Sequence, residues 1–292
     1  SHPYTIFVKT NNASGLYPSN NYGYVGKKNI EKSKSNNTVR IFFVGGSTVQ
    51  TFDENKGPDS HWPGQIEKKI NKKIKNNMQI EVINAGFSGY TSVESLIEFQ
   101  LRGLEFKPDI LFIYHNINDV RQIQMVDKFQ PDYSHSRKAT NIKKSIFDNF
   151  PNQNIILSLH IILRLIIRLF GKNNNLISQI SHLPFCSEEP FDQNRVEIFK
   201  RNIFNLISIA LANKILPVII EWEYDKKKEI EMSYFKKEYD NRSLREKCIK
   251  YINENNKALK ELCGKNNIIH LKLDDLRSEY FDNDGIHFSN IG

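Results

Sequence analysis

An aspartate and a histidine three residues apart, near the end of this 292-residue chain, have the types and spacing of a catalytic pair. In the run Asp284-Gly285-Ile286-His287 both side chains would lie on one side of a tight turn, as residues i and i+3 do on a helix. The carboxylate could then hold one imidazole nitrogen while the other faces outward. Ser47 supplies a candidate nucleophile, because it follows a predicted buried strand and two glycines. Serine, histidine and aspartate in these roles make an acyl-transfer site.

Five short runs rich in β-branched and aromatic residues alternate with helical patterns. They predict strands at residues 39–44, 80–84, 110–114, 218–222 and 268–271. Apolar residues at helical spacing predict helices from about Trp62, after Thr91, over 196–210 and over 244–262. Thr91 and Glu94 have the spacing of a capping box. This alternation predicts a mainly parallel sheet covered by helices on both faces.

The polar residues that could take part in catalysis or binding follow the predicted strands. Ser47 follows the first strand, residues 86–90 the second and 115–119 the third, and the Asp284/His287 pair comes after the last. Ligands of open parallel sheets bind beyond the carboxyl ends of the strands. We therefore expect one crevice to collect these residues.

Residues from about 130 to 190 break the alternation and predict an inserted segment. Its centre, 155–170, is apolar except for Ser158 and for His160, Arg164 and Arg168, which are spaced by four. A helix there would carry one narrow polar stripe, which favours a packed lid or cap. An interfacial membrane helix with snorkelling arginines and a partner interface are the alternatives.

The composition excludes several classes of protein. The net charge of +8 comes from lysines scattered among asparagines and isoleucines, which indicates solvated helix faces rather than nucleic-acid binding. No segment is apolar for long enough to span a bilayer. Cys248 and Cys263 would lie ~22 Å apart on one helix and so cannot form a disulfide. The chain begins at Ser1-His2 without a methionine, so a leader or anchor could have been removed.

Four sequence blocks follow one another in a recognisable order. They are Gly45-Gly46-Ser47-Thr48, the run from Asn84 to Thr91, Asn116-Ile117-Asn118-Asp119 and Asp284-Gly285-Ile286-His287. The ordered set resembles the SGNH hydrolases, the GDSL-type esterase and lipase superfamily. The resemblance implies a three-layer α/β/α sandwich whose five-stranded parallel sheet has the order 2-1-3-4-5. The break in the alternation at about 130–190 adds an inserted helical cap to this fold. The domain would cover residues 38–292, after an N-terminal extension over 1–37.

The resemblance also implies roles for individual residues. Ser47 would be the nucleophile, His287 the base and Asp284 its partner, while the oxyanion hole would consist of the N–H groups of Ser47 and Gly89 and the side-chain amide of Asn118. The chain departs from the family pattern where Gly46 replaces an aspartate, Thr48 a leucine and Asn116 a glycine. None of these positions has a triad or oxyanion role, so the departures bear on the substrate.

Three further residues near the strand ends are possible substrate contacts. They are His115, Glu221 and Trp222, each of which could equally be a packing residue. Asp119 is expected to tie down its loop. Asp282-Asn283-Asp284-Gly285 lacks the later glutamate of a calcium loop, so no metal is expected, and the chemistry requires no cofactor.

The sequence thus predicts a serine ester hydrolase that removes short O-acyl groups, such as acetyl, from a carbohydrate or small ester. Alternatives are an O-acyltransferase with the same triad, a lipase or lysophospholipase-like esterase, a binding module that cradles a phosphate at the Gly45-Gly46-Ser47-Thr48 turn, and a degenerate hydrolase kept as a scaffold. The expected partner is a small-molecule or glycan ester, without nucleic acid. Membrane association is a further possibility, and the resemblance favours an extracytoplasmic or membrane-tethered location.

Overall fold

The computed structural model describes residues 19–26, 28–51, 60–75, 77–124, 129–135, 189–228, 242–273 and 276–289. The chain divides into two units, one formed by Ser1–Ile123 with Pro190–Gly292 and the other by Gln124–Glu189. The predicted cap helix at 155–170 lies outside the described residues, as does Cys186. The N-terminal extension and the bounds of the insertion stay predictions.

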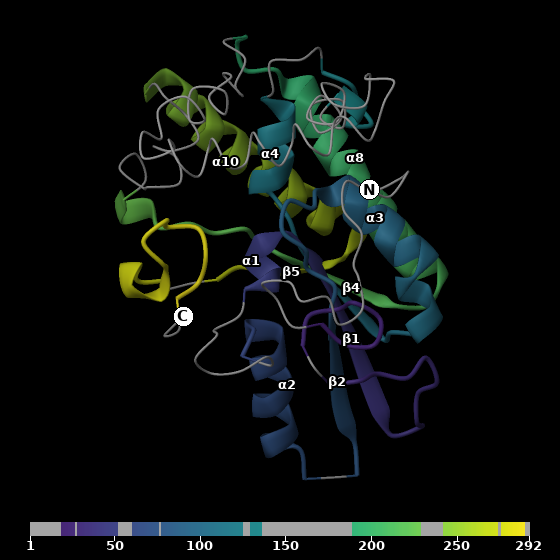
Figure 1. Cartoon of the computed structure of the whole chain (residues 1–292). Coiled ribbons are helices and arrows are strands. Elements are labelled where there is room, and N and C mark those ends of the chain that lie inside the picture. Colours follow the sequence, from purple (N-terminus) through teal and green to yellow (C-terminus); the bar gives the residue numbers. More distant parts are fainter. Residues whose placement is uncertain are drawn as a thin grey trace, which may run out of the picture. The chain divides into compact units, whose positions relative to one another are not determined.

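The first unit is built on a five-stranded sheet of order β2-β1-β3-β4-β5 in which every neighbouring pair is parallel (Figure 1). The strands are β1 Thr38–Gly45, β2 Gln79–Asn84, β3 Ile110–Tyr114, β4 Leu216–Ile220 and β5 Ile269–Leu271. The predicted fold class and strand order are therefore confirmed.

Strand β4 begins and ends two residues earlier than the predicted range of 218–222. Leu216 joins the strand because its N–H donates to the carbonyl of Asp109. Trp222 leaves it, since its carbonyl accepts a hydrogen bond from Asn256 of a covering helix instead of from the sheet.

Helices follow the strands as the periodicity predicts. The α-helices are α1 Ser47–Gln50, α2 Trp62–Lys73, α3 Ser92–Leu101, α4 Ile117–Ile123, α8 Gln193–Ala212 and α10 Arg242–Asn266. Helix α2 packs on β2, α3 on β1 and α8, and α8 on β4 (Figure 1). Because the β1-to-β2 crossover runs opposite to the later ones, right-handed connections put α2 on one face and α3, α8 and α10 on the other.

Local signals fix where helices start beside the sheet ends. The capping box at Thr91 and Glu94 is present, with the Thr91 N–H donating to the Glu94 carboxylate at 2.9 Å. In α2 the His61 ring accepts the N–H of Gly64, and Pro63 occupies the first turn. The Thr91 cap sets the direction in which α3 leaves the loop after β2.

The core lies on both faces of β1 and β3. Phe42, Phe43 and Leu111 have no exposed surface, and Phe43 stacks on Phe112 with ring centroids 4.7 Å apart. Cys248 and Cys263 lie buried in α10, the single helix that their surrounding pattern predicted, and both are free cysteines. Among the helices of the described ranges, none combines the length and apolar character needed to cross a membrane.

Candidate active site

Ser47 is the first residue of α1, directly after β1 and its two glycines. The turn is tight: a Cβ at Gly45 would lie 2.2 Å from Cγ2 of Val49 and 2.7 Å from the carbonyl oxygen of Tyr114. The indole N–H of Trp62 donates to the carbonyl of Thr48 at 2.8 Å and anchors the same turn. Glycine at position 45 thus allows the chain to turn sharply enough to present the Ser47 hydroxyl at the strand end.

The loop from Phe281 to Phe288 holds Asp284 and His287 in a fixed geometry. Oδ1 of Asp284 accepts the backbone N–H groups of Ile286 and His287, at 3.0 and 3.1 Å. Oδ2 of Asp284 lies 2.5 Å from Nδ1 of His287. Gly285 adopts a φ of 75°, a left-handed conformation that a residue with a side chain would adopt only with strain.

The other imidazole nitrogen reaches the candidate nucleophile. Nε2 of His287 lies 2.8 Å from Oγ of Ser47, across 240 residues of sequence. The three predicted residues therefore form one hydrogen-bonded chain. Burial opposes ionisation of Asp284, but the hydrogen bond and charge of His287 and the two backbone N–H groups outweigh it and lower the pKa of the carboxyl.

The segment after β4 supports this loop. The N–H of Asp225 donates to the carbonyl of Gly285 at 2.9 Å, and the hydroxyl of Ser278 donates to Oδ1 of Asp225. Phe288 stacks against Phe281 at the base of the loop. These contacts define the height and direction of His287 above the sheet.

The predicted oxyanion donors lie around the same turn. Gly89 has a φ of 80°, and the side-chain amide of Asn118 donates to the carbonyl of Tyr90 at 2.9 Å. A Cβ on Gly46 would lie 2.3 Å from Nδ2 of Asn118, so the amide rests directly against the residue before Ser47. The backbone N–H groups of Ser47 and Gly89 donate to no other residue in the described part of the chain.

Gln50 is a supporting residue that the sequence did not reveal. Its side-chain oxygen accepts the N–H of Ser88 at 2.6 Å and so ties the Gly89 loop to the helix that begins with Ser47. Gln50 is 5 % exposed. No local pattern predicts this contact, because it joins residues 38 positions apart.

Asp119 connects the first turn of α4, which carries Asn118, to the start of α3 after the Gly89 loop. Its side chain has no exposed surface, and it accepts the N–H of Ser92 through both oxygens and the Ser92 hydroxyl through Oδ1. Because Ser92 opens α3 directly after the Gly89 loop, this contact fixes α3 against the start of α4. The structural role expected for Asp119 matches these contacts.

Two of the three possible substrate contacts are enclosed by protein. His115 is 3 % exposed, and its Nε2 lies 2.8 Å from the hydroxyl of Ser95. Burial lowers the pKa of His115 to about 3, even with the Asp119 carboxylate 3.7 Å from Nδ1. Trp222 is 1 % exposed, so burial argues against substrate contact by either residue. Glu221 is partly exposed and lies 3.7 Å from the His270 ring, and its contact with substrate stays a prediction.

Asn116, which departs from the family pattern, fastens the third strand end to α10. Its amide donates to the carbonyl of Ile252 at 3.0 Å and to the side chain of Asn256, while its oxygen accepts from Asn255. A glycine could make none of these side-chain bonds. Across the described ranges, no group of three or more His, Cys, Asp or Glu residues is placed to hold a metal ion.

Fold and site together define an α/β protein with a serine, a histidine and an aspartate at the carboxyl ends of its strands. The model of the GDSL-like lipase/acylhydrolase family matches residues 43–292, and the chain belongs to this family. Family membership places the chain among ester hydrolases in general.

The solved structures that resemble this chain have low sequence identity to it. The lipase/acylhydrolase from Enterococcus faecalis is 17 % identical, with 87 % of this chain and 88 % of that chain covered and a TM-score of 0.49. A GDSL-like lipase from Bacteroides thetaiotaomicron is 15 % identical, with 86 % and 80 % covered and a TM-score of 0.43. The acetyl xylan esterase AlAXEase is 12 % identical, with 87 % and 93 % covered and a TM-score of 0.47. No curated protein matches the chain in sequence.

Proposed function

We propose that the protein is a serine ester hydrolase in which Ser47, His287 and Asp284 form the catalytic triad, and that it removes short O-acyl groups from carbohydrates or small esters. The observation that carries the proposal is the unbroken hydrogen-bonded chain from Ser47 Oγ through the imidazole to Asp284. A structural ion pair would have no need of the serine at its far end.

In the first step, Oγ of Ser47 attacks the ester carbonyl while Nε2 of His287 takes the hydroxyl proton. Asp284 fixes the imidazole with its Nδ1–H toward the carboxylate and stabilises the imidazolium that forms. The lowered pKa of Asp284 supports this role, because the carboxylate stays ionised when the imidazole becomes charged.

The tetrahedral intermediate carries a negative oxygen that needs donors. The N–H groups of Ser47 and Gly89 and the Asn118 amide are the proposed donors. The two backbone groups have no competing acceptor among the described residues, and Tyr90 holds the amide in place. Collapse of the intermediate expels the alcohol, which takes its proton from His287 and leaves an acyl-Ser47 ester. Water activated by His287 then releases the acid.

A polar alcohol portion suits the surroundings of the catalytic loop. Glu223, Asp225 and Lys226 lie on the segment that supports the loop. Charged groups at this place fit a carbohydrate or another small polar ester better than a long acyl chain, which would offer no donor to the carboxylate oxygens that lack a partner among the described residues.

The decisive experiment uses the Ser47→Ala variant. The wild type should hydrolyse p-nitrophenyl acetate and acetylated sugars and should react covalently with a fluorophosphonate, whereas Ser47→Ala should do neither while keeping a native circular dichroism spectrum. Equal labelling and turnover in the variant would overturn the assignment of the nucleophile. A comparison of acetyl with octanoyl esters tests the preference for short acyl groups.

A further inference from the structure

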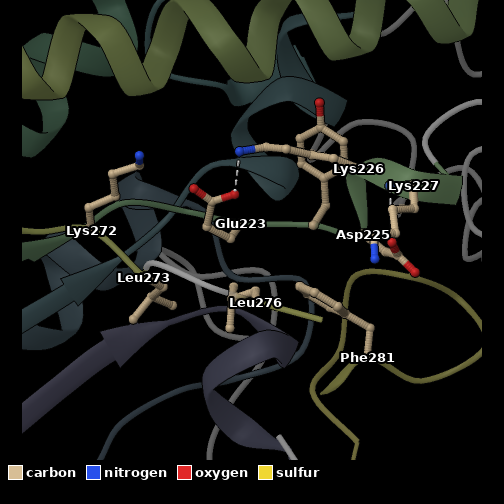
Figure 2. Close-up of a pocket in the computed structure, with 9 residues that line it drawn as sticks. Glu223, Asp225, Lys226, Lys227, Lys272, Leu273, Leu276 and Phe281 are labelled. Atoms are coloured by element: carbon tan, nitrogen blue, oxygen red, sulfur yellow. Dashed lines mark hydrogen bonds and ion pairs between the residues drawn. The ribbon is translucent and has the colours of Figure 1, made fainter. Parts of the chain in front are cut away.

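A pocket of about 270 Å³ lies beside the catalytic loop, between the segment after β4 and the end of β5 (Figure 2). It is lined by Glu223, Tyr224, Asp225, Lys226, Lys227, Lys272, Leu273, Leu276 and Phe281. Its volume is close to the lower end of the ~300–1,000 Å³ typical of small-molecule sites. The pocket therefore suits a ligand, or a part of one, about the size of a single ring.

The acidic side chains of the pocket are buried and only partly paired. Glu223 is 4 % and Asp225 3 % exposed. Oε2 of Glu223 lies 2.8 Å from the ammonium group of Lys226, a pair that Figure 2 shows among the lining residues. Within the described part of the chain, Oε1 of Glu223 and Oδ2 of Asp225 have no hydrogen-bond partner. Buried acceptors of this kind call for a donor from a ligand or solvent.

The mixture of charges excludes several kinds of ligand. A metal cation would meet three lysines around only two carboxylates, and an anion would meet the buried Glu223 and Asp225. An apolar acyl chain would leave the carboxylate oxygens without donors. A neutral molecule with many hydroxyl groups has neither problem, since each hydroxyl can donate to a carboxylate and accept from an ammonium group.

The remaining walls fit the same ligand class. Tyr224 and Phe281 are aromatic, and Leu273 and Leu276 are aliphatic. These side chains can cover the C–H faces of a sugar ring while the charged residues bind its hydroxyl groups. Pockets that combine apolar walls with a few polar groups in fixed positions select ligands by orientation.

The pocket is also joined to the catalytic machinery by covalent and hydrogen-bonded contacts. Phe281 begins the loop that carries Asp284 and His287, and the N–H of Asp225 donates to the carbonyl of Gly285 in the same loop. A ligand held by Asp225 therefore touches a residue that positions the proposed base.

We infer that this pocket binds the polyhydroxylated, carbohydrate part of the substrate, with Glu223 and Asp225 accepting hydrogen bonds from its hydroxyl groups. This inference rests on the proposed function, because the bound carbohydrate is part of a substrate only if the protein hydrolyses its ester. Binding of an unacylated sugar does not depend on hydrolysis, so the two can be tested separately.

The test is calorimetric titration of the protein with xylotriose, cellotriose and triacetylchitotriose, with choline, citrate and hexanoate as cationic, anionic and apolar comparison probes. At least one trisaccharide should bind, more tightly than each comparison probe. Glu223→Gln should weaken that binding ~10-fold or more, because it replaces a charged acceptor by a neutral amide, which accepts more weakly and through one oxygen only. Glu197→Gln, a charge removal on the exposed surface of α8, is the matched control and should leave the affinity unchanged.

Leu276→Trp gives a second route, because it fills the pocket without removing a charge, and it should also abolish sugar binding. Ester turnover in a protein that binds none of the trisaccharides would overturn this inference and leave the proposed function standing. Sugar binding that survives both Glu223→Gln and Leu276→Trp would likewise overturn the assignment to this pocket. The proposed function itself would be contradicted by a different result, namely the absence of ester turnover in the wild type.

Discussion

Gly46 and Asn118 are packed against each other so closely that a methyl group at position 46 would lie 2.3 Å from the amide nitrogen of Asn118. That nitrogen is the proposed side-chain donor to the oxyanion, and it is held by the carbonyl of Tyr90. Where the family pattern has an aspartate, this chain has the residue that leaves the most space. The small residue thus allows the amide to lie beside Ser47.

Gly46→Ala should therefore act through Asn118. We expect the methyl group to displace the amide and to lower kcat for p-nitrophenyl acetate ~10-fold or more. Asn118→Ala should lower kcat by ~10²–10³, the usual cost of one oxyanion donor. Because both changes remove the same donor, the double variant should be no slower than Asn118→Ala alone. If the fold-losses in kcat of the two single variants multiply in the double variant, Gly46 does not act through the oxyanion hole.

Asp284→Asn should cost up to ~10⁴ in kcat, because an amide can hold the imidazole in the wrong tautomer. Asp282→Asn is a matched control in the same loop. The Asp282 backbone N–H donates to the carbonyl of His287, and the Asp282 carboxylate acts on His287 through its charge, whereas Asp284 also holds the ring by a hydrogen bond. Steady-state kinetics of both variants measure the difference. A silent Asp284→Asn beside an inactive Asp282→Asn would mean that the acid is two positions earlier.

Asp119→Asn should damage the site without touching substrate. The amide cannot accept through both side-chain atoms, so one of the bonds that Ser92 donates is lost inside the protein. We expect a loss of ~1–3 kcal/mol in the free energy of unfolding. A fall in kcat with little change in KM should accompany it, because Gly89 and Asn118 would no longer be held together. Ser92→Ala should lower both the stability and kcat, each by less than Asp119→Asn does. If Asp119→Asn is destabilised but keeps a normal kcat, the role of Asp119 is purely structural.

The sequence predicted the sheet and the triad candidates more completely than the residues that hold the triad and the oxyanion loop in place. Strand runs such as β3 are short, apolar and flanked by polar residues, and Asp284 and His287 form a local pair, so both leave a signal in neighbouring residues. His115 was expected near the crevice from its place after a strand, but whether it faces outward depends on α3, where Ser95 binds it. Gln50 and Asp225 act through contacts with distant loops, and such contacts have no local pattern.

Buried His115 should make stability depend on pH in a defined window. In the folded protein burial lowers its pKa to about 3, whereas its ordinary value is 6.5. As the pH falls below 6.5, the unfolded chain takes up a proton that the folded protein does not. The stabilisation from neutral His115 is therefore complete above 6.5 and is lost progressively as the pH falls toward 3.

Urea unfolding of the wild type and of His115→Gln at pH 7 and pH 4.5 measures this contribution. Glutamine does not titrate and can still form a hydrogen bond to Ser95. A difference in unfolding free energy that is the same at both pH values comes from the substitution itself and cancels in the comparison. The wild type should lose ~2–3 kcal/mol more than the variant between the two pH values, since each pKa unit corresponds to about 1.4 kcal/mol. Parallel losses would mean that His115 is protonated in the folded protein near its ordinary pKa. In that case the Asp119 carboxylate, and not burial, would control its charge.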